Sequence, residues 1–447
     1  MLNRKILATL RQWKNNTARK PLILRGARQV GKTTAIEIFS KEFENYIHLN
    51  LELKEDRDIF NEALSIKELF QAILVIKNVK LKNGKTLLFI DEIQNSPVAV
   101  KMLRYFYEKL KELYVVAAGS LFELMLEKSQ ISFPVGRVQF AYMYPLTFEE
   151  FLEANREEQL LETYRATPVK AFATTKLFEW FHRYTMIGGM PEIVKQYSEN
   201  KDVPALKTLY ESLLTSYLDD ADKYARNPTM RQILRHCLES VPFEAGKRIK
   251  FQGFGNSNYR SREVGEALRT IERAMLVYLI YPSTSLQLPI VADQKKSPKL
   301  QFVDTGLLNY FAGLQPVFFQ YADLHSFYKG LIAEHIVRQE LIAQNAEDNK
   351  KPLFWVREKG QSNAEVDIVL PYKNYVIPVE VKSGKTGAMR SLHQFVNESK
   401  HPYAVRLYEG SFEITESKTP EGKPYKLLNL PYFLAGRIQD YLGLLIK

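Results

Sequence analysis

The sequence predicts a multidomain α/β protein whose N-terminal part is a doubly wound parallel sheet. Short apolar segments alternate with segments of helical periodicity over residues 2–118, as expected for strands joined by helical crossovers. The segment 86–90 is apolar at almost every position, which is typical of a strand buried on both faces of a parallel sheet. The chain of 447 residues is too long for one core, and usual domain sizes suggest about three domains.

The elements of this first sheet follow one another closely. Apolar residues at helical spacing indicate a helix over 2–15. A short apolar run at 22–24 that meets Gly26 predicts a strand and a turn. The further predicted elements are a helix at 33–43, a strand at 46–51, a helix at 69–79, a strand at 86–90, a helix at 98–112 and a strand at 114–118. Such alternation produces right-handed crossovers and a parallel sheet.

The remaining two thirds of the chain change character twice. Helical patterns cover 148–200, with a break at 187–191, and then 206–240; a glycine-rich, basic stretch leads into a helix at 261–275 and a strand at 276–281. The last section predicts a helix, strands at 353–357, 364–370 and 375–381, a helix from 389 and a strand at 403–407. We expect a core at 1–147, a helical lid or connector at 148–205, a middle domain at 206–322 and a C-terminal α/β domain at 323–447.

Composition restricts the class of protein. Hydrophobic residues make up 45% and charged residues 25% of the chain, which are ordinary values for a globular protein. No apolar run approaches the roughly 20 residues that a membrane-spanning helix needs, and basic residues interrupt the N-terminus, unlike a signal peptide. The single cysteine, Cys237, excludes an intramolecular disulfide and a zinc site built from several cysteines. We therefore expect a cytoplasmic protein and no membrane partner.

The net charge of +11 favours a polyanionic partner, nucleic acid above all. No acidic residue precedes Glu37, whereas basic residues are frequent there. The alternative is a solvated amphipathic helix that leads into the first strand.

A glycine-rich loop between the first strand and the next helix carries the clearest chemistry. It fits the pattern G-x-x-x-x-G-K-[ST], in which converging backbone amides and a helix N-terminus bind phosphate. The lysine reaches the β and γ phosphates of a nucleotide, and the hydroxyl that follows completes a magnesium shell. The predicted ATP-binding residues are Gly26, Ala27, Arg28, Gln29, Val30, Gly31, Lys32, Thr33 and Thr34.

Further catalytic candidates follow the later strands. Asp91 and Glu92 end the strand at 86–90, so Asp91 is predicted to hold Mg²⁺ together with Thr33, and Glu92 to act as general base on water. Ser120 is a candidate γ-phosphate sensor; the alternative is a helix cap. Arg137 is the candidate cation for the transition state, donated to a neighbouring subunit of a homo-oligomeric ring; the alternative is a surface salt bridge. Arg28, inside the glycine-rich loop, is a second candidate for this cation.

Several segments together resemble the AAA-type ATPases of bacteria and archaea that carry a C-terminal domain of unknown function. These segments are 25–34, Phe-Ile-Asp-Glu-Ile-Gln at 89–94, Ala-Gly-Ser-Leu at 118–121, Val-Gly-Arg at 135–137, Tyr-Pro-Leu-Thr-Phe-Glu-Glu-Phe at 144–151, Gly-Gly-Met-Pro at 188–191 and Pro-Lys-Leu-Gln-Phe-Val-Asp-Thr-Gly-Leu at 298–307. The resemblance implies a P-loop fold, ATP hydrolysis and a winged-helix-like middle section. Residues 241–260 are longer and richer in glycine than that pattern.

A second group of charged residues lies in the C-terminal section. Glu380 and Lys382 share one face of a predicted strand, and Glu365 and Asp367 share one face of the strand before it. With Glu334 on a helix, the order is similar to the PD-(D/E)xK pattern of restriction-endonuclease-like folds. Such carboxylates suit a second Mg²⁺ or Mn²⁺, and the lysine would then orient a water for attack on a phosphodiester. The alternative is a docking module in which these acids form structural salt bridges.

The middle section is basic and predicts DNA binding. A helix–turn–helix arrangement would present the helix at 261–275 to DNA, and aromatic residues between basic ones also suit single strands. The residues concerned are Lys247, Arg248, Lys250, Arg260, Arg262, Arg269 and Arg273, with Phe251, Phe254 and Tyr259. Two functions remain open: an ATPase that acts on DNA and carries a nuclease-like domain, or an ATP-controlled switch that binds a protein partner.

Overall fold

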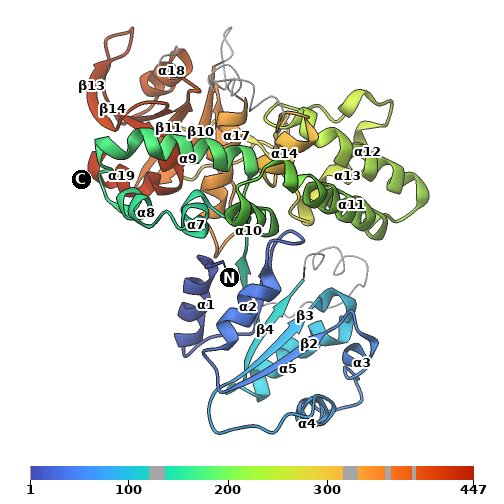
Figure 1. Ribbon diagram of the computed structural model, residues 1–447. Coiled ribbons are helices and arrows are strands. Elements are labelled where there is room, and N and C mark those ends of the chain that lie inside the picture. The colour runs from blue at the N-terminus through green and yellow to red at the C-terminus, as the bar shows by residue number, and fades with distance from the viewer. Residues whose placement is uncertain (1, 120–135, 316–330, 358–363, 385–388, 447) are drawn as a thin grey trace.

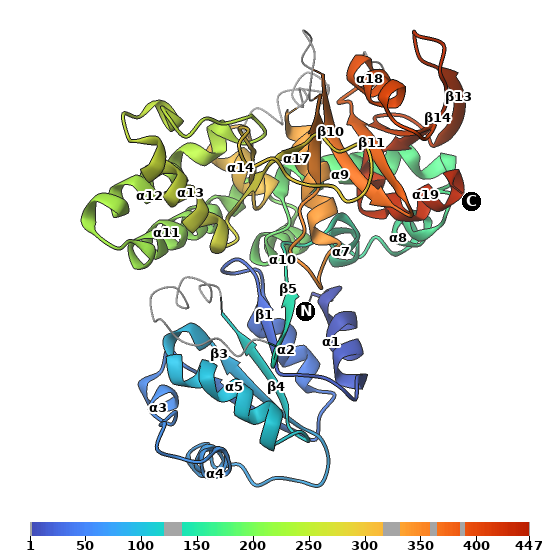
Figure 2. The ribbon, with the colours of Figure 1, turned by 180° about the vertical axis from the view of Figure 1, so that it is seen from behind.

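The computed structural model describes residues 2–119, 136–315, 331–357, 364–384 and 389–446. Figures 1 and 2 show a five-stranded sheet with helices α1 to α5 as one lobe, and the later helices with a seven-stranded sheet as a second, larger lobe. No helix in these ranges is both long and apolar enough to span a bilayer.

The first lobe is the parallel sheet that the sequence predicts. Its strands are β1 (Leu22–Arg25), β2 (Asn45–Asn50), β3 (Thr86–Asp91), β4 (Tyr114–Ala118) and β5 (Gln139–Tyr142). They lie in the order β2-β3-β4-β1-β5, and every neighbouring pair is parallel. Sequence analysis did not identify β5, which is short and only half buried.

Helices cover both faces of this sheet, which confirms the doubly wound architecture. Alternate strand residues point to opposite sides: Leu87 and Phe89 of β3 belong to one core, whereas Leu88 and Ile90 belong to another. The first core packs α1 (Ile6–Asn15) and α2 (Lys32–Ser40), and the second packs α4 (Ile66–Ile76) and α5 (Pro97–Lys109). A short α3 (Lys54–Arg57) follows β2.

The second lobe begins with helices. They are α7 (Phe148–Ala154), α8 (Glu158–Arg165), α9 (Thr174–Ile187), α10 (Pro191–Asn200), α11 (Lys207–Tyr224), α12 (Pro228–Glu244) and α13 (Ser261–Arg273). After them, β6 (Val277–Ile280) pairs with β8 (Lys299–Phe302) in an antiparallel ribbon, and α14 (Thr305–Phe311) follows. Helices α12 and α13 pack against each other. Buried residues of both belong to the same hydrophobic core as α1 and α2, which is called the main core below.

The C-terminal part is a mixed sheet with helices on both faces. Its order is β13-β14-β12-β11-β10-β9-β7. The strands are β7 (Pro282–Ser283), β9 (Leu353–Val356), β10 (Glu365–Tyr372), β11 (Tyr375–Val381), β12 (Tyr403–Tyr408), β13 (Glu413–Lys418) and β14 (Pro424–Pro431). Helices α17 (Leu331–Ala343), α18 (Arg390–Glu398) and α19 (Ile438–Leu445) pack around it, and the 3-10 helix η5 (Tyr432–Arg437) precedes α19.

The Gly-Gly-Met-Pro segment at 188–191 meets the segment 298–307 at Asp304, which is completely buried. Its Oδ2 accepts a hydrogen bond from the Gly189 amide at 2.6 Å, and the Gly189 carbonyl accepts one from the Leu146 amide at 2.7 Å. A Cβ atom on Gly188 would lie 2.1 Å from Asp304 Oδ1, so no larger side chain fits there. Burial raises the pKa of Asp304 to about 6. These motifs are therefore structural.

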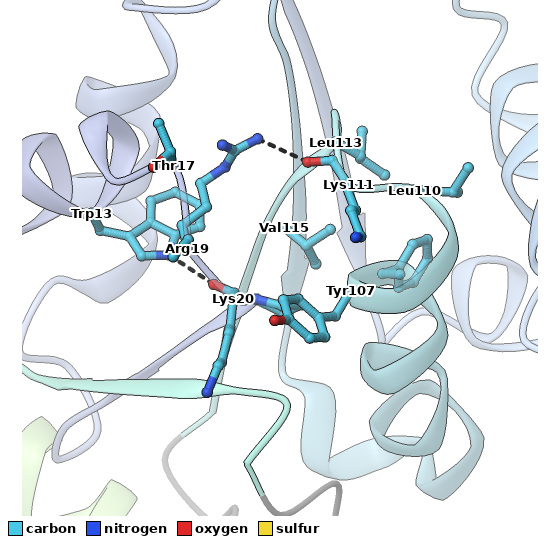
Figure 3. Close-up of a pocket in the computed structure, with 12 residues that line it drawn as sticks. Trp13, Thr17, Arg19, Lys20, Tyr107, Leu110, Lys111, Leu113 and Val115 are labelled. Atoms are coloured by element: carbon cyan, nitrogen blue, oxygen red, sulfur yellow. Dashed lines mark hydrogen bonds between the residues drawn. The ribbon is translucent and has the colours of Figure 1, made fainter.

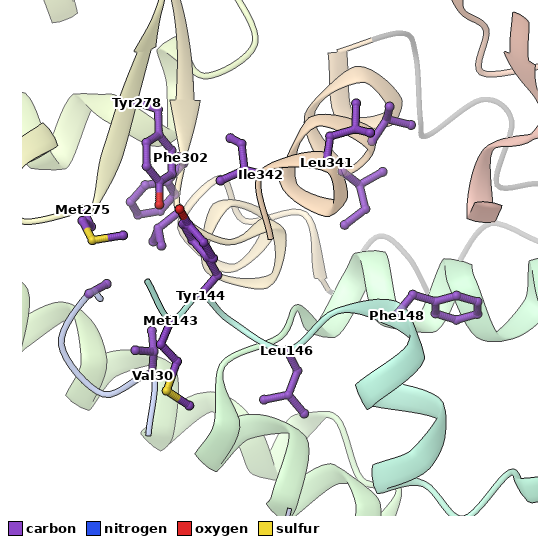
Figure 4. Packing of buried hydrophobic residues seen from close by; sticks show 14 of the residues in the cluster. Val30, Met143, Tyr144, Leu146, Phe148, Met275, Tyr278, Phe302, Leu341 and Ile342 are labelled. Atoms are coloured by element: carbon purple, nitrogen blue, oxygen red, sulfur yellow. The ribbon is translucent and has the colours of Figure 1, made fainter. Parts of the chain in front are cut away.

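Apolar residues from all parts of the chain join in one core at this junction. Figure 4 shows Val30 of the glycine-rich loop beside Met143, with Leu146 on the same side and Tyr278 and Ile342 from later elements above them in the view. The loop thus rests on side chains that belong to the second lobe.

Candidate functional site

The glycine-rich loop adopts backbone conformations that require its residue types. It leaves β1 after Arg25 and enters α2 at Lys32. Gly31 has φ 89° and Gln29 has φ 64°, both in the left-handed region. A Cβ atom on Gly26 would lie 2.4 Å from the Met143 carbonyl oxygen. The loop therefore turns back on the end of β1, with its amides at the N-terminus of α2.

The Lys32 side chain lies inside this loop. It is 7% exposed, and its Nζ donates to the carbonyl oxygens of Ala27 at 2.9 Å and Gly26 at 3.1 Å. Burial lowers the pKa of Lys32 to about 8, although the charges of Glu92 and Asp91 oppose this shift. An ammonium held in this way is ready to exchange carbonyl contacts for the oxygens of a triphosphate.

Asp91 and Thr33 lie together, as a magnesium site requires. Thr33 Oγ1 donates to Asp91 Oδ2 at 2.7 Å. Burial alone would raise the pKa of Asp91, but the neighbouring His48 side chain and the hydrogen bond from Thr33 outweigh it and the pKa is lowered. His48 Nε2 lies 3.8 Å from Asp91 Oδ2; sequence analysis missed this residue because β2 lies beside β3 only in the folded sheet. A hydroxyl and an ionised carboxylate are oxygen ligands that fit Mg²⁺ shared with phosphates.

Glu92 occupies the next position with a strained backbone, at φ 51° and ψ 44°. Burial raises the pKa of its carboxyl group, which favours proton acceptance near neutral pH. Gln94 donates from Nε2 to Glu92 Oε2. Gln94 Oε1 is buried and has no hydrogen-bond partner among the described residues. Ser120, the predicted γ-phosphate sensor, lies outside the described residues.

Helix α11 of the second lobe covers the outer side of the loop. Arg28 Nη1 forms an ion pair with Asp220, whose side chain is 1% exposed. Tyr217 donates from its hydroxyl to the Arg28 carbonyl oxygen at 3.3 Å, and Gln29 Nε2 donates to Ser216 Oγ at 3.3 Å. Sequence analysis missed these contacts because Arg28 and Asp220 are 192 residues apart.

Arg137, predicted as the transition-state cation, pairs within this chain with a surface residue of α5. Its Nε lies 3.1 Å from Glu108 Oε1, and its side chain is 46% exposed. This contact corresponds to the alternative of a surface salt bridge. Donation to a second subunit stays a prediction.

The four residues of the predicted nuclease-like group do converge, around a lysine that sequence analysis did not include. Strands β10 and β11 pair with Ile368 opposite Val379, which brings Asp367 beside Glu380. Lys299 of β8 is 4% exposed. Its Nζ lies 2.7 Å from Glu334 Oε1, 2.9 Å from Glu365 Oε1 and 3.9 Å from Asp367 Oδ1.

The arrangement of these acids fits an ammonium better than a metal ion. Arg338 Nη2 also donates to Glu334 Oε1 at 2.7 Å, and Lys382 Nζ donates to Glu380 Oε1 at 2.6 Å. Burial and the neighbouring charges of Glu334 and Glu380 raise the pKa of Asp367 to about 8. In the described ranges, no group of three or more His, Cys, Asp or Glu side chains is placed to hold a metal. The second Mg²⁺ or Mn²⁺ stays a prediction.

The basic middle section exposes arginines, whereas its aromatic rings are partly or fully buried. Arg262 and Arg269 are exposed and seven positions apart on α13, so they share a face. Phe254 is 3% exposed, and Phe251 and Tyr259 pack against the main core. The expectation that these rings stack on single-stranded bases is wrong for Phe254, because its ring is inside the fold. Arg248 pairs with Glu365 at 3.4 Å.

The histidines near the acidic group have structural roles. His335 is buried, and its Nε2 accepts a hydrogen bond from the Phe302 amide at 2.9 Å. His393 Nε2 lies 3.0 Å from the Tyr425 hydroxyl.

Figure 3 shows a pocket of about 210 Å³. It lies beside the amino ends of β1 and β4, at the opposite end of the first sheet from the nucleotide loop. Residues before β1 and before β4 line it, including Arg19, Lys20 and Lys111. Arg19 spans its rim by donating to the Lys111 carbonyl oxygen at 3.0 Å. Because nucleotides bind at the carboxyl ends of parallel strands, this pocket is not part of the site above.

Family models match three segments of the chain. Residues 18–152 match the model described as AAA domain, 178–317 a Domain of unknown function (DUF8612), and 329–428 a Domain of unknown function (DUF4143). No curated protein matches the chain.

Among solved structures, the Walker-type ATPase PABY2304 of Pyrococcus abyssi is 14% identical and has a TM-score of 0.44, with 70% of this chain and 96% of that chain covered. The RuvB Holliday junction branch migration motor of Thermotoga maritima is 16% identical with a TM-score of 0.28, covering 66% and 93%. The ORC1 protein of Aeropyrum pernix, in complex with DNA, is 13% identical with a TM-score of 0.25, covering 72% and 94%. With the parallel sheet and the glycine-rich loop, the match at 18–152 identifies the N-terminal lobe as an AAA-type P-loop ATPase domain.

Proposed function

We propose that the chain hydrolyses ATP with Lys32, Thr33, Asp91 and Glu92, and that it uses this turnover to act on DNA. One observation carries the first part: a buried lysine, a hydroxyl–carboxylate pair at 2.7 Å and a carboxyl group of raised pKa meet at the carboxyl ends of β1 and β3. This combination matches the needs of phosphoryl transfer, which is catalysed by positioning and by charge stabilisation.

Each of these groups has a defined task. The loop amides and Lys32 bind the phosphates, and Thr33 and Asp91 would hold Mg²⁺, which supplies charge neutralisation between the β and γ phosphates. Glu92 accepts a proton from the attacking water. Gln94 donates a hydrogen bond to Glu92 Oε2 and so fixes the orientation of the carboxyl group, which leaves Glu92 Oε1 to accept the proton.

Two substitutions test the ATPase. We expect Lys32→Ala to weaken ATP binding, and Glu92→Gln to bind ATP but to turn over roughly 100-fold more slowly, because general-base catalysis contributes on this order. Turnover is measured as phosphate release, and binding by calorimetry. Lys101→Ala is the matched control for Lys32, since Lys101 forms an exposed ion pair with Glu62 and lies outside the loop. Equal turnover by wild type and Glu92→Gln would remove the proposed base.

DNA binding is proposed for the exposed face of α13. Arg262 and Arg269 lie on that face. Of the two acidic residues between them, Glu266 pairs with Arg226 at 3.0 Å, and Glu263 accepts a hydrogen bond from the Arg260 amide at 3.2 Å. Two arginines on one face of a helix, two turns apart, suit phosphate contacts more than base recognition. The packing of α12 and α13 beside the β6–β8 ribbon is compatible with the winged-helix expectation.

The DNA proposal is tested by fluorescence anisotropy with duplex, branched and single-stranded DNA at several salt concentrations. Arg262→Ala/Arg269→Ala should weaken binding and reduce its salt dependence by about two phosphate contacts. Lys67→Ala/Lys80→Ala removes two exposed charges in and after α4 and is the control. Binding that is identical in both double variants, or ATP turnover indifferent to every DNA form, would oppose a role in DNA metabolism.

A second candidate is an ATP-controlled switch that binds a protein partner, with a non-catalytic C-terminal domain. The ammonium of Lys299 among the acids favours it, because this cation satisfies the carboxylates without metal. Plasmid nicking with Mg²⁺ or Mn²⁺ separates the two. Cleavage by wild type that is lost in Asp367→Ala and Lys382→Ala supports a nuclease; equal, background nicking by all three supports the docking module.

A further inference from the structure

We propose that Arg28 is a further catalytic residue of the ATP site and that Asp220, on α11, is the positioning residue that holds it. This inference rests on the ATP hydrolysis proposed above. It assigns the cation of the transition state to the same chain that binds the nucleotide, and it gives a residue of the second lobe a task in catalysis.

The charge of Arg28 already belongs to the nucleotide site. Arg28 is the third residue of the loop, between Gly26 and the lysine that binds phosphate. Burial works to lower the pKa of Arg28, but the hydrogen bond and charge of Asp220, and the charge of Glu92, outweigh it. The positive charge of Arg28 in turn works to lower the pKa of Lys32. These mutual effects indicate that Arg28, Lys32 and Glu92 share one electrostatic environment.

The guanidinium retains donors for a ligand. Arginine carries five N–H donors in a planar fork. In the part of the chain that the structure describes, Arg28 donates to a side chain through Nη1 alone, to Asp220. Its side chain is 36% exposed, so the guanidinium is not closed off by α11. One edge of the fork is therefore anchored while the others are free to meet phosphate oxygens.

Asp220 is built as an anchor. Its side chain is 1% exposed, and its Oδ2 has no hydrogen-bond partner among the described residues. Tyr217, one turn earlier on α11, donates to the Arg28 carbonyl oxygen at 3.3 Å and so fixes the backbone of the same residue. A buried carboxylate is costly unless it is paired, and Asp220 Oδ1 pairs with Arg28 and also with Lys223 Nζ at 3.0 Å. Arg28 is thus held at both its side chain and its backbone before nucleotide binds.

Arg28 is better placed within this chain than Arg137. The Arg137 guanidinium is 46% exposed and pairs with Glu108 on α5, whereas Arg28 is part of the phosphate-binding loop itself. A cation aimed at the transferring group costs no reorganisation during the reaction when it is held beforehand.

The step that Arg28 would assist is hydrolysis of the terminal phosphoryl group. The water oxygen forms a bond to the γ phosphorus while the bond from that phosphorus to the β,γ-bridging oxygen breaks, which leaves ADP. The proton of the water passes to Glu92, and inorganic phosphate is the second product. Arg28 offsets the negative charge on the equatorial oxygens during this transfer.

The experiment compares full-length variants at two neighbouring acids. Asp219 is 69% exposed and lies 4.0 Å from Arg235, so Asp219→Asn is the matched control for Asp220→Asn. Steady-state ATP turnover is measured for both, for Arg28→Ala, and for the conservative variant Asp220→Glu. Binding of ADP alone and of ADP with aluminium fluoride, a mimic of the planar phosphoryl group, is measured by calorimetry. Thermal unfolding shows whether each variant is folded.

We expect Arg28→Ala to lower kcat by about 10³-fold, because a transition-state arginine contributes on this scale. Asp220→Asn should lower kcat roughly 10- to 100-fold with little change in KM, as a displaced catalytic group does, and Asp220→Glu should recover part of the loss. Both Arg28→Ala and Asp220→Asn should bind ADP normally but ADP with aluminium fluoride more weakly. Asp219→Asn should match wild type in every assay.

The failures are distinguishable. If Glu92→Gln is inactive but Asp220→Asn and Arg28→Ala behave like Asp219→Asn, the ATPase stands and this inference is wrong. If Arg28→Ala weakens ADP and the aluminium fluoride complex equally, Arg28 only binds nucleotide and the inference is wrong. If wild type does not turn over ATP, the proposed function fails, and equal affinity of wild type and Arg28→Ala for ADP with aluminium fluoride would overturn this inference separately.

Discussion

Replacing Lys299 by methionine tests whether an ammonium ion holds the acidic group of the C-terminal sheet together. Methionine is similar in length but uncharged, so the change removes the cation and leaves the packing. Lys299 Nζ has carboxylate oxygens of Glu334 and Glu365 at 2.7 and 2.9 Å, in a site where the lysine is 4% exposed. Removing one partner of such a buried ion pair costs about 3–5 kcal/mol.

The pH dependence follows from the pKa shifts. The folded pKa of Lys299 is raised above its ordinary value of 10.5: burial opposes this shift, but the neighbouring carboxylates outweigh it. The stability that Lys299 contributes is therefore fully present below pH 10.5 and is lost as the pH rises through the folded value. Asp367, with a pKa of about 8, is protonated at pH 6 and ionised at pH 9. The variant must tolerate this extra buried charge at pH 9, so its loss of stability should be larger there than at pH 6.

Amide hydrogen exchange on peptides from β10 and β11, corrected for intrinsic rates, measures the local opening free energy. A cost of about 3–5 kcal/mol corresponds to roughly two to four powers of ten in protection. Lys295→Met, which changes an exposed lysine of the preceding loop, is the control. Equal protection in Lys299→Met and Lys295→Met, or a loss that is larger at pH 6 than at pH 9, would refute the reasoning.

Three further predictions concern the nucleotide site and the junction. Because Lys32 has a pKa of about 8 before nucleotide binds, ATP affinity measured by calorimetry should fall roughly tenfold per pH unit above 8; an affinity that is flat between pH 7 and 9.5 would contradict this. Asp304→Ala leaves the Gly189 and Leu307 amides without their acceptor, and should destabilise the fold by about 1–3 kcal/mol per amide in denaturant unfolding; Asp293→Ala is the comparison, and equal midpoints would count against a structural role. Gly306→Ala puts a Cβ atom 1.9 Å from the Ile187 carbonyl oxygen; we expect a lower melting temperature, and an unchanged one would show that the junction can yield.

The sequence was sufficient where chemistry and local structure coincide. The segment from Gly26 to Thr33 combines a strand end, a loop and a helix start in eight residues, and Asp91 directly follows a buried strand. Pairing of the strands that carry Asp367 and Glu380 also followed from alternation, because the two strands are adjacent in the chain.

Contacts between distant residues could not be predicted in this way. Neither Lys299 nor Asp220 belongs to a local pattern: Lys299 reaches Glu334 and Asp367 from another sheet, and Asp220 meets Arg28 across 192 residues. Local periodicity carries no information about which distant helix covers a loop. The strand β5 was missed for a different reason, since four residues, three of them half-buried, give too short an alternation to recognise.

The hydrogen bonds around Asp304 have a mechanical consequence. Leu146 follows the last strand of the first sheet, Gly189 joins α9 to α10, and Asp304 precedes α14, yet their polar groups bond to one another away from water. Separating these three segments would leave several buried polar groups without hydrogen-bond partners at once, each at a cost of about 1–3 kcal/mol. This junction therefore resists separation of the first lobe from the second, and the contacts of Asp220 and Tyr217 on α11 with Arg28 connect the two lobes at a second place.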